Sequence, residues 1–312
     1  MDLTIIIVNW NSAEYVRKCL GSLFANTKGT EFEVIVIDNA SYDDCEKVVV
    51  GQFPQVRFFQ SERNLGFAGA NNWGAEEAKG EWLLFLNPDT EINGDAVEGM
   101  LEVGRTLPDA GAVGCKLLNT DGTTQTSCVQ RFPTILNQVL TWDVLYRLLP
   151  AISKLDFAKK GPLNVEVVSG ACLMMRKSSF VAIGGFSSEY FMYTEDIDLC
   201  YKAHQAGYRN YYTGASSVLH HGGGSSHHCR ENSYADVQMG ESVFKFLRKT
   251  RGAFYANLYK KAMFLNGIAR FVLLWASASV LRLCGRKASF QTSITKWRDV
   301  IRWSLGMEKW AR

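Results

Sequence analysis

Short runs of apolar residues alternate with helix-like segments along the first third of the chain. Four runs predict strands, at residues 3–8, 32–38, 56–60 and 81–87. The segments between them, at residues 11–26, 42–53 and 67–80, carry apolar residues at helical spacing. Continuous apolar strands separated by helices are typical of a parallel sheet covered on both faces. The pattern therefore predicts an α/β fold with a Rossmann-like, mostly parallel sheet flanked by helices.

The pattern also suggests how some elements begin and how the middle of the chain continues. Asn11 followed by Glu14 resembles a capping box, which predicts that the first helix starts directly after the first strand. Residues 110–118 predict a further strand, 120–163 loop and helix, and 165–177 a buried strand.

The predicted strand ends are rich in polar residues: "VNWN" at 8–11, "IDNAS" at 37–41, "ERNLG" at 62–66 and "LNPDT" at 86–90. Ligands of open α/β sheets bind at the carboxyl ends of the strands. Asn, Asp and Gly can also simply form turns, but four polar ends together favour a ligand cleft. The turn after the first strand has no glycine, which disfavours a dinucleotide-binding fingerprint, and the sequence has no P-loop.

Charge separates the end of the chain from the rest. The net charge of +3 combines about −9 over residues 1–240 with about +12 over residues 241–312. Residues 241–287 are helix-like and aromatic, and their longest uncharged run, 271–281, has 11 residues. Because a spanning helix needs about 20, we expect a basic amphipathic helix lying in an anionic membrane surface. A helical subdomain packed on the body is the alternative, and nucleic acid is not expected as a partner because no nucleic-acid module is apparent.

The eight cysteines include no C-x-x-C pair, and no basic region precedes the first apolar run. We therefore expect no signal peptide, reduced thiols and a cytoplasmic location. Cys172 and Cys200, in apolar segments, are expected to be small core residues.

Two positions suggest cation or phosphate chemistry. Asp89 follows a buried strand, where it could hold Mg²⁺ with diphosphate oxygens or simply cap a turn. His220 and His221 precede a triple glycine, where either could bind a metal or phosphate or lie exposed in a loop.

Six blocks together resemble the family 2 glycosyltransferases of the GT-A fold. They are "TIIIVNWNSAEYVRKCLGSL", "VIVIDNAS", "NLGFAGANNWG", "LLFLNPDT", "GACLMMRKSSFVAIGGFSSEYFMYTEDIDLCYKAHQAGY" and "HHGGGSS". Their order and spacing match over roughly residues 1–230, and the likeness is greatest to the rhamnosyltransferase-like branch that builds bacterial surface polysaccharides.

The resemblance implies roles for individual residues. Nucleotide-sugar binding would fall to Val8, Trp10, Asp38, Arg63, Asn64, Asn87 and Asp89. Asn87-Pro88-Asp89 stands where the family has D-x-D, so the first acid is missing and metal binding passes to Asp89. His220 would complete a site for Mg²⁺ or Mn²⁺, with His221 as its nearest rival.

The resemblance also assigns the carboxylates of "YTEDIDLC". Asp196 would be the catalytic base, Glu195 would lie beside the acceptor, and Asp198 would belong to the first turn of a helix.

From the resemblance we expect a GT-A catalytic domain at residues 1–240 and a helical extension at 241–312. The enzyme would be an inverting transferase that moves L-rhamnose from dTDP-L-rhamnose to a lipid-linked saccharide, peripheral on the inner face of the cell membrane. Transfer from a UDP donor, a nucleotidyltransferase and a catalytically silent scaffold subunit are the alternatives. Retention of Asp89 and Asp196 argues against a silent subunit.

Overall fold

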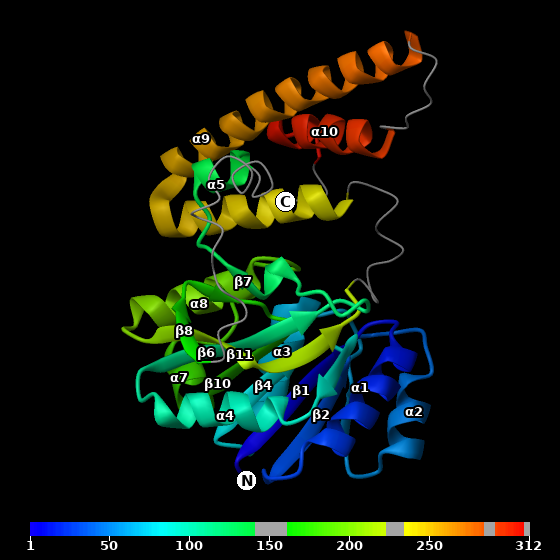
Figure 1. The fold of residues 1–312 in the computed structure, drawn as a ribbon, viewed down its shortest axis with the longest axis vertical. Coiled ribbons are helices and arrows are strands. Elements are labelled where there is room, and N and C mark those ends of the chain that lie inside the picture. Colours follow the sequence, from blue (N-terminus) through cyan, green and yellow to red (C-terminus); the bar gives the residue numbers. More distant parts are fainter. Residues whose placement is uncertain (141–160, 223–233, 284–290, 309–312) are drawn as a thin grey trace. The chain divides into compact units, whose positions relative to one another are not determined.

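The computed structural model describes residues 1–140, 161–222, 234–283 and 291–308 (Figure 1). Part of the loop and helix expected at 120–163 lies outside these residues, as do Cys229 and Cys284. The chain divides into two compact units, Met1–Phe132 with Asp156–Ser225 and Pro133–Leu155 with Ser226–Arg312. The domains expected at 1–240 and 241–312 stay a prediction; these units group residues 133–155 and 226–240 with the second unit.

The first unit is built on a nine-stranded sheet with the order β3-β2-β1-β4-β10-β6-β11-β5, in which β8 pairs with β11. These strands are β1 (Leu3–Asn9), β2 (Phe32–Asp38), β3 (Arg57–Gln60), β4 (Trp82–Leu86), β5 (Thr90–Asn93), β6 (Ala110–Leu118), β8 (Pro162–Val165), β10 (Cys172–Arg176) and β11 (Arg209–His220). Strands β3, β2, β1 and β4 run parallel, and β10 pairs antiparallel with both β4 and β6. The mostly parallel α/β sheet predicted from the sequence is confirmed.

Helices cover both faces of this sheet. They are α1 (Ala13–Asn26), α2 (Cys45–Gln52), α3 (Gly66–Glu77), α4 (Ala96–Thr106), α7 (Lys177–Ala182) and α8 (Glu195–Gln205). Gly74 of α3 packs against Ile6, and Gly104 of α4 packs against the Trp82 ring. Leu3 pairs with Trp82, and Ile6 lies three positions further along β1. Because side chains alternate between the faces of a strand, α3 and α4 lie on opposite faces.

The predicted capping box at the first helix is wrong. Helix α1 begins at Ala13, and its N-cap is Ser12 without a side-chain cap. Asn11 has φ 52°, and its side chain accepts the backbone N–H of Tyr42 at 2.8 Å instead. The Ala13 N–H donates to Asp43 at 2.7 Å, so the helix start is satisfied by an acid from the loop after β2.

The buried strand predicted at 165–177 is interrupted. It forms β9 (Val167–Val168), which pairs with β7 (Val129–Gln130), and then β10 after a turn at residues 169–171. The six cysteines within the described residues are free and buried, as predicted for Cys172 and Cys200.

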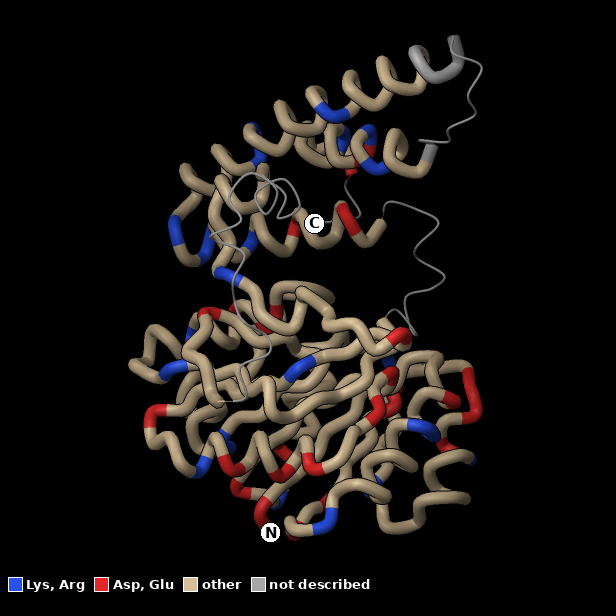
Figure 2. The backbone as a smooth tube through the Cα atoms, viewed as in Figure 1, with Lys and Arg blue, Asp and Glu red and all other residues tan. Residues whose placement is uncertain are grey.

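The second unit is helical. Its helices are α5 (Ile135–Val139), α9 (Tyr234–Leu283) and α10 (Gln291–Ser304), and α9 bends at Gly252, which has φ 86° and ψ 166°. The Trp303 indole donates to Glu241 at 2.7 Å, and the Arg270 guanidinium lies 4.9 Å from the Trp297 ring centre. Both tryptophans are buried, so α10 covers one side of α9. Lys and Arg outnumber Asp and Glu along the described helices of this unit (Figure 2).

Candidate functional site

The carboxyl ends of β1, β2 and β3 are joined through the carboxylate of Asp38. Asn9 donates its side-chain amide to Asp38 Oδ2 at 2.9 Å. The Ser41 backbone N–H and the Gln60 amide both donate to Oδ1, each at 2.8 Å. Asp38 is 2% exposed, and these donors compensate for the burial of its charge. They also fix the positions of three strand ends relative to one another.

Four of the other residues predicted to hold the nucleotide lie in or shortly after β1 and β3. Val8 in β1 and Trp10 just after it are half-buried, whereas Arg63 and Asn64 are exposed in the loop after β3. Asn64 accepts the side-chain amide of Asn39 at 3.0 Å, which ties this loop to the end of β2. The structure thus brings all four to the same edge of the sheet as Asp38.

Asp38, Asp43 and Cys45 form one compact group of metal-ligand types among the described residues, with ligand atoms within 4.8 Å of one another. Its carboxylates are already engaged, since Asp43 accepts from Asn9 at 3.2 Å and from the Ala13 N–H at 2.7 Å. Burial raises the pKa of the Cys45 thiol, and Asp38 and Asp43 raise it further. Because metals bind the thiolate, this group is better explained as a structural link than as a metal site.

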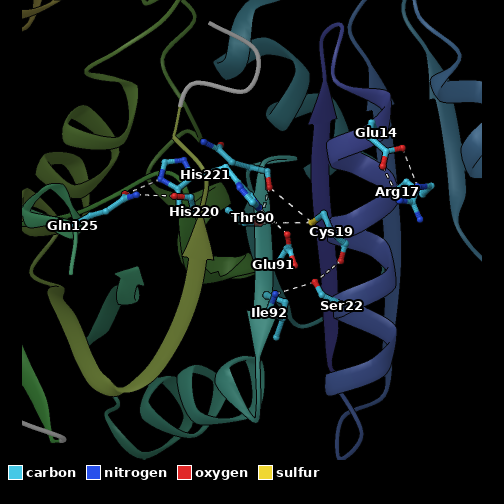
Figure 3. Close-up of polar contacts among 11 residues, drawn as sticks. Glu14, Arg17, Cys19, Ser22, Thr90, Glu91, Ile92, Gln125, His220 and His221 are labelled. Atoms are coloured by element: carbon cyan, nitrogen blue, oxygen red, sulfur yellow. Dashed lines mark hydrogen bonds and ion pairs between the residues drawn. The ribbon is translucent and has the colours of Figure 1, made fainter. Parts of the chain in front are cut away.

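Asp89, directly before β5, faces His220, the last residue of β11, which pairs with β5. Asp89 is 5% exposed, and its Oδ1 lies 3.4 Å from His220 Nε2. His221, labelled beside it in Figure 3, instead has its Nε2 2.7 Å from Glu91. Its ring centre lies 5.4 Å from that of Tyr15. His220 is the last residue of β11, and His221 follows it, so the two rings leave the chain in different directions.

The donor set formed by Asp89 and His220 fits a divalent cation. A carboxylate oxygen suits Mg²⁺ or Mn²⁺, which bind in nucleotide sites through one or two carboxylates and the phosphate oxygens. An imidazole nitrogen with a free lone pair can provide a second ligand.

Backbone hydrogen bonds connect the end of β4 to the start of α8. The Asn87 N–H donates to the carbonyl of Ala171 at 2.9 Å. The neighbouring Gly170 N–H donates to Asp196 Oδ2 at 2.9 Å, and the Ile197 N–H donates to Oδ1 at 2.8 Å. Asp196 is therefore held in one orientation by two backbone donors while its side chain stays partly exposed.

The backbone directly before these carboxylates is strained. Tyr193 and Thr194 have φ 67° and 72°, in the left-handed region. A β-branched residue such as Thr194 is rarely found there, and such strain clusters at functional sites. Thr194 is the N-cap of α8, so this backbone sets where Glu195 and Asp196 emerge from the helix.

Glu195 and Asp196 have different surroundings although they are adjacent. Glu195 is 8% exposed, and its Oε2 has no hydrogen-bond partner among the described residues. Burial raises the pKa of Glu195 to about 8, and the nearby Asp196 carboxylate adds to the rise. Burial also raises the pKa of Asp196, against the effect of the Gly170 and Ile197 N–H groups. The pair therefore contains one enclosed carboxyl that keeps its proton near neutral pH and one accessible carboxylate.

Asp198 does more than the predicted helix start requires. It lies in the first turn of α8, as expected, but its side chain is completely buried. It accepts the Ser187 hydroxyl at 2.6 Å and the Tyr190 hydroxyl at 3.3 Å, and Lys202 lies 3.7 Å away. Lys202 also donates to the Gly185 carbonyl. Asp198 thus holds the loop before α8 in place. An acidic residue in the first turn of a helix does not by itself predict such a role.

Comparison with known proteins identifies the family. The model of glycosyl transferase family 2 matches residues 4–184, more than half of the chain. The chain belongs to glycosyltransferase family 2. The protein is thus a glycosyltransferase, and the resemblance that its sequence shows is confirmed.

Its curated relatives include rhamnosyltransferases. It is 28% identical over 241 residues to the N-acetylglucosaminyl-diphospho-decaprenol L-rhamnosyltransferase of Mycobacterium tuberculosis, covering 70% of this chain and 76% of that protein. It is 26% identical over 259 residues to the rhamnosyltransferase WbbL of Escherichia coli, covering 79% of this chain and 93% of that one.

Solved structures share the fold. A mannosyltransferase from Pyrobaculum calidifontis, in complex with GDP-mannose and Mn²⁺, aligns with a TM-score of 0.62 and 17% identity over 98% of this chain and 86% of its own. GalNAc-T7, with UDP, GalNAc and Mn²⁺, aligns with a TM-score of 0.55 and 18% identity over 70% of this chain. The alignment covers only 44% of the GalNAc-T7 chain. The glycosyltransferase therefore has the GT-A architecture.

The burial of Glu195 predicts a pH-dependent stability. Between its ordinary pKa near 4.5 and about 8, the folded state keeps the Glu195 proton that the unfolded state loses. The free energy of unfolding should therefore fall as pH rises through this window, by up to about 1.4 kcal/mol per pH unit. Glu195→Gln lacks this titration, so urea unfolding should show its stability rising relative to the native enzyme as pH increases.

Glu76→Gln, at an exposed position on α3, controls for the loss of a negative charge. A stability difference between Glu195→Gln and the native enzyme that stays constant across the window would show that Glu195 is not protonated in the folded state.

Proposed function

We propose that this glycosyltransferase moves L-rhamnose from dTDP-L-rhamnose onto a lipid-linked saccharide, with inversion at the anomeric carbon. The observation that carries the proposal is a set of hydrogen bonds at the carboxyl end of β4. They link the segment of Asp89 to the Asp196 carboxylate through residues 170 and 171. Asp89 faces His220 at 3.4 Å on one side, and backbone donors hold Asp196 on the other. Two rhamnosyltransferases among the relatives, one named for a decaprenol-linked substrate, support the donor and acceptor classes.

Asp89 and His220 would hold Mn²⁺ or Mg²⁺, which supplies positive charge for a departing diphosphate. Asn87, in place of the family's first acid, is left as a contact on the nucleotide side. Arg63, exposed in the loop after β3, adds a positive charge at the edge where we place the nucleotide.

Asp38 would accept the N3–H of the base, with Val8 and Trp10 beside it. Three protein donors already bind its carboxylate. Since a carboxylate has about four acceptor positions, one position is left for this contact. Uracil and thymine both present an N3–H, so a UDP-sugar is the second candidate donor.

Asp196 would act as the catalytic base. It removes the proton from an acceptor hydroxyl, the oxygen forms the new bond to the anomeric carbon, and the bond to the diphosphate breaks. A raised pKa makes a carboxylate a better base. The Gly170 and Ile197 N–H groups fix its orientation, and its partial exposure lets an acceptor approach. Glu195, more enclosed than Asp196, would line the acceptor side.

Asp196→Asn tests the base. The amide keeps the shape and can still accept from Gly170, but it cannot take a proton. We expect transfer to fall roughly 10²–10⁴-fold, with dTDP affinity in the presence of Mn²⁺ unchanged by calorimetry. Asp44→Asn, at an exposed acid, is the matched control. Turnover of the Asp196→Asn enzyme close to that of the control would refute the assignment.

The second unit offers a surface for the membrane that carries a lipid-linked acceptor. Along α9, large apolar side chains recur every three, four or seven residues and are exposed: Phe254, Leu258, Leu265, Ile268, Val272 and Trp275. This spacing places them on one side of the helix, which we call the apolar stripe. Exposed basic residues, Arg248, Lys249, Arg251 and Lys261, lie within about ten positions of the bend at Gly252. An apolar face with flanking basic residues suits an anionic bilayer surface.

By length and composition, α9 includes one stretch that is apolar enough to cross a membrane, within Tyr234–Ser279. This stretch is longer than the uncharged run at 271–281 because it also includes Arg270. However, α10 covers α9 near Arg270 and carries Lys296, Arg298 and Arg302. Spanning would take these charges into hydrocarbon at a high cost. We therefore propose that α9 lies in the membrane surface with the apolar stripe toward the lipid.

Leu265→Ser with Trp275→Ser tests the apolar stripe. Burying one large apolar side chain is worth roughly 1.5–3 kcal/mol, so the double variant should bind phosphatidylglycerol vesicles at least about tenfold more weakly in sedimentation. Val50→Ser, which removes an exposed apolar side chain from α2, is the control. Unchanged sedimentation of the double variant would contradict the proposal, and resistance of the bound native enzyme to alkaline carbonate extraction would indicate a spanning helix instead.

A further inference from the structure

Gln125 contacts His220 at two points. Gln125 lies just before the short 3₁₀ helix η1 (Thr126–Cys128), and its backbone N–H donates to the Leu117 carbonyl at 2.8 Å. Its side-chain Nε2 lies 2.7 Å from the backbone oxygen of His220, and its Oε1 lies 2.8 Å from His220 Nδ1 (Figure 3). One amide group therefore binds both the backbone and the ring of the same histidine.

These two contacts fix where the imidazole proton lies. A backbone carbonyl oxygen only accepts, so the amide end that faces it must be the NH₂ group. The amide oxygen then faces Nδ1, and an amide oxygen also only accepts. Nδ1 must therefore carry a hydrogen, and in the neutral ring Nε2 keeps its lone pair. That nitrogen is the one that lies 3.4 Å from Asp89.

We propose that Gln125 is a positioning residue that holds His220 in its Nδ1–H tautomer and so presents Nε2 as a metal ligand beside Asp89. The inference rests on the metal site of the proposed function. Metal-binding histidines commonly donate their other ring nitrogen to a carbonyl or carboxylate, which fixes the tautomer and the ring orientation. The amide of Gln125 does this without adding a charge to the site.

The same geometry separates His220 from its neighbour. His221 directs Nε2 to the Glu91 carboxylate at 2.7 Å, so this nitrogen is engaged by another side chain. His220 has its Nδ1 engaged and its Nε2 directed toward Asp89. Gln125 therefore explains why His220, rather than His221, serves the cation.

Gln125→Met tests the inference, because methionine keeps the length of the side chain and removes both polar contacts. We expect Mn²⁺ affinity, measured by calorimetry in the presence of dTDP, to fall about 10–100-fold. Gln130→Met makes the same change on β7 and should leave Mn²⁺ affinity unchanged. His220→Ala should lose at least as much affinity as Gln125→Met.

Nitrogen NMR of the metal-free native enzyme, labelled with ¹⁵N-histidine, provides a test that does not require the Gln125→Met variant to fold. At mildly alkaline pH the His220 signals, assigned by their loss in His220→Ala, should show the Nδ1–H tautomer. The Nε2–H tautomer in the native enzyme would overturn the inference.

The binding results distinguish two failures. If His220→Ala weakens Mn²⁺ binding but Gln125→Met does not, Gln125 is not the positioning residue and the metal site stands. If His220→Ala leaves Mn²⁺ affinity unchanged, the metal site is wrong and the inference falls with it.

Discussion

The antiparallel insertion of β10 between β4 and β6 brings the end of β4 next to the residues that contact the start of α8, where we propose that catalysis takes place. Because β10 runs opposite to β4, its first residues lie beside the last residues of β4. The backbone there bonds Asn87 to Ala171, and the next residue, Gly170, bonds to Asp196. Two neighbouring backbone groups, at residues 170 and 171, thus connect the end of β4 with the Asp196 side chain.

The enzyme contains two kinds of buried carboxyl group. Asp38 and Asp198 are buried with several donors, and these contacts hold strand ends and the loop before α8 in place. Glu195 is also buried, but the burial raises its pKa to about 8. Compensated carboxylates give a site its shape, whereas an uncompensated one next to Asp196 couples the site to the proton concentration.

The sequence predicted the sheet well where apolar runs were unbroken. Residues 32–38 and 110–118 form β2 and β6 with the expected ends. Local patterns failed where a distant partner decides the outcome. The Asn11 side chain accepts the Tyr42 N–H instead of capping the helix. The hydroxyl contacts of Asp198 form with residues outside its own helix, so its helical position did not predict them. Gln125 lies 95 positions before His220, and no local sequence pattern connects them. By contrast, the Ser-Gly pair at 169–170 is a turn signal that could have predicted the break before β10.

The proposed enzyme binds a nucleoside diphosphate through a divalent cation held by Asp89 and His220. Thermal unfolding of the native enzyme with dTDP-, UDP- and GDP-sugars, each with and without Mn²⁺, tests this binding most directly because a ligand raises the melting temperature of the state that binds it. We predict that dTDP-L-rhamnose raises the melting temperature most, and only when Mn²⁺ is present. An equal rise without Mn²⁺, or no rise with any nucleotide sugar, would contradict it.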